Sequence, residues 1–85
     1  MPNYYKIMDL VNRFSKMFNM NQYPKSSQLT FDAMDNSDMV CKVRTYFDNQ
    51  NNGWIPEPNL NDVWWHPDAR LYVHFDIVCG TLTIG

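Results

Sequence analysis

The chain has 85 residues and a formal net charge of −2, and 45% of its residues are hydrophobic and 15% aromatic. This length fits one domain, residues 1–85, with one hydrophobic core, and the composition excludes a disordered chain because enough apolar surface is available for burial. The small acidic charge excludes the strongly basic surface of proteins that bind nucleic acid directly through its phosphates.

The first expected element is an amphipathic helix over about residues 3–20. Lysine, aspartate and asparagine side chains lie opposite a contiguous apolar face, and Asn3 is a suitable N-cap. The apolar residues recur three and four positions apart, as Tyr4, Ile7, Leu10, Val11, Phe14, Met17 and Phe18. This helix is expected to pack on a sheet.

Alternation of apolar and polar residues predicts strands at about residues 28–34, 39–48, 62–65 and 70–79. A strand over 39–48 would place Arg44 and Tyr46 on one face and Cys41 on the other. Cys79 likewise falls at an apolar position, so we expect both cysteines to be buried thiols rather than a redox or zinc site.

The segment at residues 48–62 is rich in asparagine and contains two prolines, which predicts a long loop. Trp54 and Ile55 within it form an anchor that is either pinned to the core or presented to a partner. Pinning is favoured, because a large aromatic side chain is seldom left in water.

The tetrapeptide from His66 to Ala69 has proline at its second position, which favours a tight turn that closes a hairpin. Opposed residues of a hairpin share a face. Trp64 would then lie opposite Leu71 in the core, and Trp65 would lie opposite Arg70 on the other face.

Together these elements predict an α+β fold in two layers, with one N-terminal amphipathic helix packed on a three- to four-stranded antiparallel sheet. One helix covers one face of such a sheet. The second face must meet solvent, the long loop, another copy of the chain or a partner.

Two His-x-Asp pairs offer side chains that bind metals or act in acid/base catalysis: His66 with Asp68, and His74 with Asp76. The expected register separates the two histidines by about 13 Å, and no nucleophile or phosphate-loop motif accompanies them. A small metal-dependent or acid/base enzyme is therefore the second interpretation. We expect neither catalysis nor a cofactor.

The favoured site is the second sheet face, because tryptophan, tyrosine and arginine dominate binding energy at protein interfaces. Alternatively, the 48–62 loop folds over the aromatic rings of this second face, or Arg70 only stacks on Trp65. Trp54 supplies a second contact to the predicted partner-binding set, which is Trp65, Arg70, Tyr72, His74, Tyr46 and Arg44.

Residues 1–44 carry a net charge of +2 and residues 45–85 a net charge of −4, which favours a protein partner with a basic surface. The abundance of Asn, Asp, Tyr and Met, with little Glu and Ala, resembles the composition of small phage or virus gene products that dock onto a host enzyme. This resemblance implies a non-enzymatic binding protein, such as an anti-CRISPR-like or anti-restriction-like inhibitor of a host nuclease or defence complex.

A homodimer that pairs its second sheet faces, or an accessory subunit of a larger assembly, is a third interpretation. The first residues lack the pattern of a secretory signal, and no apolar run approaches the ~20 residues that span a bilayer. We therefore expect no membrane partner and a cytoplasmic location, which for a phage or viral protein is the host cytoplasm.

Overall fold

The computed structural model describes residues 2–34 and 36–85. Its elements confirm an α+β fold with an antiparallel sheet, but two helices and six strands replace the expected one helix and three to four strands. In chain order they are α1 (Pro2–Phe18), β1 (Asn21–Gln22), β2 (Gln28–Thr30), α2 (Ser37–Asp48), the 3-10 helix η1 (Gln50–Asn52), β3 (Ile55–Pro56), β4 (Val63–His66), β5 (Leu71–Asp76) and β6 (Thr81–Ile84).

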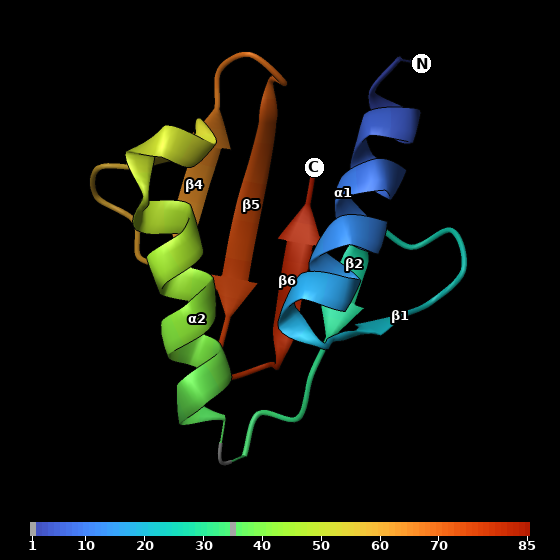
Figure 1. Ribbon diagram of the computed structural model, residues 1–85, viewed down its shortest axis with the longest axis vertical. Coiled ribbons are helices and arrows are strands. Elements are labelled where there is room, and N and C mark those ends of the chain that lie inside the picture. Colours follow the sequence, from blue (N-terminus) through green and yellow to red (C-terminus); the bar gives the residue numbers. More distant parts are fainter. Residues whose placement is uncertain (1, 35) are drawn as a thin grey trace.

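The six strands form one sheet in the order β1-β2-β6-β5-β4-β3, with every neighbouring pair antiparallel. The last strand, β6, therefore lies in the middle of the sheet, between β2 and β5. Figure 1 shows both helices in front of the same face, with α1 over the β2–β6 side and α2 over the β4–β5 side. The opposite face is covered by neither helix.

Helix α1 buries the apolar side chains that its sequence period predicts, among them Val11, Phe14 and Phe18. Tyr4, expected on the same face, lies in the first turn of the helix and is 48% exposed. Asn19 ends the helix with a φ of 55°, and the N–H of Met20 donates to the carbonyl of Ser15. This is the usual arrangement when a left-handed residue closes a helix.

Residues 39–48 form most of helix α2, so the strand predicted there is wrong. The segment satisfies both periods, since alternate residues differ in polarity while Val43 and Phe47 are one helical turn apart. Both side chains are fully buried, and the ring of Phe47 lies 5.3 Å from that of Phe14 and 5.0 Å from that of Trp64. Packing against α1 and the sheet therefore decides in favour of the helix.

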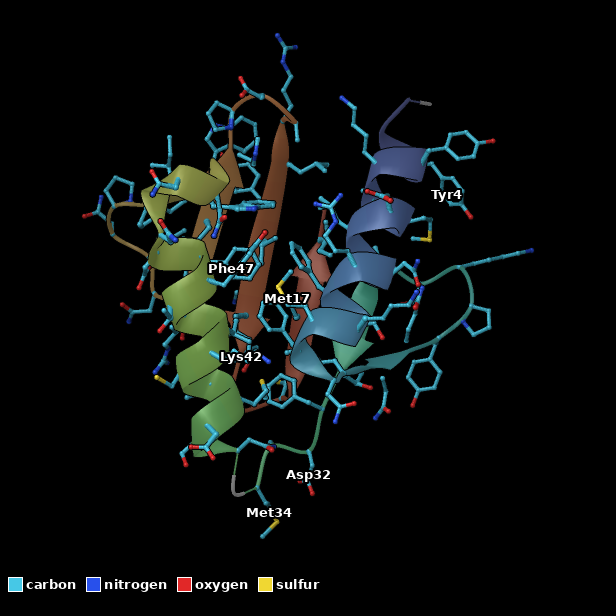
Figure 2. All side chains as sticks on the ribbon, viewed as in Figure 1. Tyr4, Met17, Asp32, Met34, Lys42 and Phe47 are labelled. Atoms are coloured by element: carbon cyan, nitrogen blue, oxygen red, sulfur yellow. The ribbon has the colours of Figure 1, made fainter. Side chains whose placement is uncertain are left out.

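The helix layer and the sheet meet around these rings. Figure 2 shows Phe47 and Met17 pointing into the space between the two helices, whereas Tyr4 and Met34 point away from it. The indole N–H of Trp64 donates to the carboxylate of Asp48 over 2.9 Å, which ties β4 to the end of α2. The core thus lies on one face of the sheet.

Two predicted strands end early. Of residues 28–34 only Gln28–Thr30 pair with a neighbour, and of residues 70–79 the strand covers Leu71–Asp76. Ile77 to Gly80 form a loop in which Cys79 is exposed, and Cys41 is exposed on α2. The predicted burial of both thiols is therefore wrong, because it depended on strand positions that neither residue occupies.

The β4–β5 hairpin has a register that differs from the predicted one. Its strands pair His66 with Leu71, Trp65 with Tyr72 and Trp64 with Val73, so the loop contains four residues rather than two. A shift of two residues preserves the side-chain direction. Trp64 accordingly lies in the core, as expected, and Trp65 on the opposite face.

The segment at residues 48–62 is built into the fold rather than forming one long loop. Its residues contribute η1 and the edge strand β3, and Trp54 is 2% exposed among the core side chains. The ring of Trp54 lies 5.3 Å from that of Phe47. Trp54 is thus pinned to the core, which was the favoured alternative. Neither described helix has the length and apolar character needed to cross a membrane.

Candidate functional site

The sheet face turned away from both helices is the candidate site, and we call it the open face. Cross-strand pairing places its side chains in rows perpendicular to the strands, because paired residues share a face. Along the strands the row members alternate with core residues. The open face comprises Ile55, Val63, Trp65, Tyr72, His74, Asp76, Thr81, Thr83, Gln28 and Thr30.

One end of the open face is apolar. Trp65 pairs with Ile55 of β3 on one side and with Tyr72 of β5 on the other. The rings of Trp65 and Tyr72 lie 4.5 Å apart at 42°, while Ile55 is 51% and Tyr72 46% exposed. We call these three residues the aromatic corner. Trp65 is half-buried between these two exposed side chains. Large side chains packed on one another across paired strands are typical of an interface anchor.

Apart from Val63, the remainder of the open face is polar and carries few charges. His74 lies in one row with Val63, Thr83 and Gln28, and the amide of Gln28 donates to the hydroxyl of Thr83 over 3.1 Å. Hydroxyl and amide groups can form hydrogen bonds with a partner without the desolvation cost of charged groups.

A depression of about 470 Å³ adjoins the aromatic corner at the β3 edge of the sheet. We call it the edge pocket; its lining is Gly53, Trp54, Ile55, Pro56, Pro67 and Asp68. Ile55 belongs to both surfaces, so the pocket is continuous with the open face. Residues from 53–56 and from the 67–68 loop meet there because β3 pairs with β4. No pattern in the sequence predicts this pocket.

The two His-x-Asp pairs do not converge. His66 shares the core-side direction of Trp64, and its ring stands edge-on to Trp54 at 5.0 Å. Its Nδ1 accepts the backbone N–H of Ala69 over 3.1 Å, which is a structural role. His74 lies on the open face, so the two histidines point to opposite sides of the sheet. Within residues 2–34 and 36–85, no group of three potential metal ligands comes together.

The carboxylate of Asp76 is used by its own loop. Its Oδ1 accepts the backbone N–H groups of Cys79 and Val78, each over 3.0 Å. The thiol of Cys79 also hydrogen-bonds to this carboxylate. The bonds from the backbone N–H and the thiol of Cys79 are the main reason that the pKa of Asp76 lies below its ordinary value. In turn the hydrogen bond and the negative charge of Asp76 raise the pKa of the Cys79 thiol. A raised pKa disfavours the reactive thiolate.

Four residues of the predicted partner-binding set do not lie on the open face, and one of them is Arg70, whose predicted place opposite Trp65 is taken by Tyr72. Arg44 and Tyr46 belong to α2, on the helix side of the sheet, because their segment is helical. The guanidinium of Arg44 donates two hydrogen bonds to the carboxylate of Asp62, over 2.9 and 2.8 Å. These bonds raise the pKa of Arg44 above its ordinary value. Tyr46 packs between Phe14 and Phe18, and Trp54 is in the core.

The other predicted residues, Trp65, Tyr72 and His74, lie together on the open face, and exposed Arg70 lies in the hairpin loop at its end. Ile55 was expected to act together with Trp54 and was not in the predicted partner-binding set, but the structure separates the two: Trp54 is buried, and Ile55 is exposed in the aromatic corner. Trp54 and Pro56, the neighbours of Ile55, are also apolar, so no alternation of polarity predicts a strand at this position. Comparisons with protein-family models, curated proteins and solved structures found no match for this chain.

Proposed function

We propose that this chain is a non-enzymatic protein-binding module that docks on a larger partner through the open face of its sheet. The observation that carries the proposal is the exposed aromatic corner on a sheet face that neither helix covers. Adjacent exposed apolar side chains on a small protein commonly mark an interaction surface.

The sheet fixes the geometry of this surface before any partner binds. Tyr72 exchanges two backbone hydrogen bonds with Gly85, over 2.7 and 2.9 Å, and faces Trp65 across the strand pair. Side chains held on paired strands lose little conformational entropy on binding. His74, Gln28 and Thr83 would supply polar contacts around the aromatic corner, and Arg70 would lie at its rim.

The size of the aromatic corner favours a larger contact area around it. Stable interfaces bury about 800 Å² on each partner, which three side chains do not provide. The corner would therefore act as the central anchor of a broader contact that includes the polar rows. The composition is the ground for the finer proposal, which is that the chain is a phage-type inhibitor that occupies the surface of a host nuclease or defence complex.

The test is capture of a partner from extracts of the native host by the immobilised chain, followed by mass spectrometry. The double variant Trp65→Ala/Tyr72→Ala should weaken binding of the partner at least about thirtyfold, because a large aromatic anchor contributes about 2 kcal/mol or more. Its thermal unfolding midpoint should change little, because both side chains are at least partly exposed.

The matched control is Tyr5→Ala/Tyr23→Ala, which removes two exposed rings from α1 and from the β1–β2 connection. This control should capture the partner as the wild type does. An equal loss of capture in both double variants would contradict the proposal. The solution mass of the wild type also bears on the identity of the partner. If this mass is twice that of one chain, and if only Trp65→Ala/Tyr72→Ala returns it to the mass of one chain, the partner is a second copy of the chain.

A further inference from the structure

The edge pocket combines apolar walls with one carboxylate. Ile55, Pro56 and Pro67 form its sides, buried Trp54 lies beneath them, and Asp68 is the only charged residue of the lining. Through Ile55 the pocket continues into the aromatic corner. A partner seated on the open face would thus reach the pocket without any rearrangement of the sheet.

The lining of the pocket carries one negative charge, that of Asp68, while Arg70, the one cation of residues 45–85, lies two residues further along the same loop and outside the lining. Asp68 is exposed, and in the described part of the chain the ion pairs join Arg13 with Asp9 and Arg44 with Asp62, leaving Asp68 free to interact. Residues 45–85, which supply the whole pocket, carry a net charge of −4. At the pocket itself the exposed Asp68 carboxylate attracts cations and repels anionic groups.

The shape and chemistry of the pocket select among cationic groups. A metal ion would need several oxygen ligands, and the lining offers one carboxylate. An apolar side chain would cover Asp68 without replacing its lost hydration. Arginine and lysine have an aliphatic stem for apolar walls and a cationic head for a carboxylate.

We infer that the edge pocket receives an arginine or lysine side chain of the protein partner, with the stem between Ile55, Pro56 and Pro67 and the cation on Asp68. This inference rests on the proposed function and names the chemistry of the partner's contact. The prolines fix their own φ angles, and the bond from the Ala69 N–H to His66 holds the 67–70 loop. The pocket is therefore formed in advance.

The experiment is an NMR titration of the ¹⁵N-labelled full chain with N-acetyl-arginine amide, N-acetyl-lysine amide and N-acetyl-citrulline amide. Citrulline has nearly the shape of arginine but no charge. The two cationic probes should shift the backbone amides of Gly53, Ile55 and Asp68 in a saturable way, and citrulline should bind at least about fivefold more weakly. Asp68→Asn should weaken the arginine probe about fivefold, as expected for one exposed ion pair.

The matched control is Asp38→Asn, which removes the same charge from an exposed position on α2, outside the pocket lining. It should leave the arginine titration unchanged. Equal binding of citrulline, equal weakening by Asp38→Asn, or shifts centred on Trp65 and Tyr72 instead of the pocket would each overturn the inference. Unaltered partner capture by Asp68→Asn would also overturn it while the proposed function stands, since that function fails only with the Trp65→Ala/Tyr72→Ala test.

Discussion

Two hairpin loops end with very different residues in the same unusual backbone conformation. The loops 67–70 and 77–80 each contain four residues, and the last residue of each donates its N–H to the carbonyl of the residue before the loop, over 2.8 and 2.9 Å. That last residue has a φ of 56° in Arg70 and 72° in Gly80. Only glycine adopts this left-handed conformation without steric cost.

Gly80→Ala should therefore destabilise the protein by about 2 kcal/mol or more, the sum of a left-handed alanine and a steric conflict. A Cβ at this position would lie 2.5 Å from the backbone oxygen of Phe31, which is closer than van der Waals contact allows. The free energy of unfolding in urea measures the effect. A loss below about 0.5 kcal/mol would show that the loop relaxes around the new methyl group.

Arg70→Gly makes the opposite change at the equivalent position of the other loop. Relief of the left-handed arginine outweighs the greater freedom of glycine in the unfolded chain, so stability should rise by up to about 1 kcal/mol. The same urea titration applies to both variants. If Arg70→Gly is less stable than the wild type, the Arg70 side chain makes contacts that stabilise the fold by more than its left-handed backbone costs.

The carboxylate of Asp76 should make stability dependent on pH. Because its pKa is lower in the folded chain than in the unfolded chain, its contribution is present above the unfolded pKa and is lost as the pH falls through the folded pKa. Asp76→Asn keeps an oxygen acceptor for Val78 and Cys79 but does not titrate. When the pH is lowered from about 6 to about 2.5, the urea concentration at the unfolding midpoint should fall further for the wild type than for the variant. Parallel losses would contradict this assignment.

At the scale of elements, helix α2 shows why period alone misled the prediction. Its sequence supports a strand with Cys41, Val43 and Phe47 on one face and a helix with Val43 and Phe47 on one side. The choice depends on the rings of Phe14 and Trp64, which are remote in sequence and reach Phe47 only in the folded chain. The strands β1 and β3, with two residues each, likewise exist only because a longer neighbour pairs with them.

The ion pair between Arg44 and Asp62 joins α2 to the residue before β4, and it should stabilise this junction. Its geometry is bidentate and the Asp62 side chain is 17% exposed, but Arg44 is 43% exposed, so solvent screening limits the contribution. Arg44→Ala should cost about 1 kcal/mol of unfolding free energy. A double-mutant cycle with Asp62→Asn measures the coupling.

The control for this pair is Arg13→Ala, which breaks the Arg13–Asp9 pair on the surface of α1, where both side chains are more than half exposed. Its cost should stay below about 0.5 kcal/mol. Equal costs for the two arginines, or no coupling in the cycle, would mean that the forked geometry adds nothing to the junction.

At the scale of the whole molecule, the sequence predicted the α+β class, the antiparallel sheet and the division of Trp64 and Trp65 between two faces. These predictions succeeded because strand alternation depends on local period and survives a register shift of two residues. The edge pocket could not be predicted, because Pro56 and Pro67 come together only through the pairing of β3 with β4. The open face was predicted, but Arg44 and Tyr46 were assigned to it only because α2 was taken for a strand.

The central position of β6 has a consequence for the order of folding. Within the sheet, β6 alone connects the β1–β2 pair to β5, and its contact between Gln28 and Thr83 spans 55 residues. Hairpins and helices form from contacts that are near in sequence, whereas this pairing must first close a long loop and pay its entropy. We therefore expect the β4–β5 hairpin and both helices to form early, and docking of β2 onto β6 to limit the rate at which the chain reaches its native state.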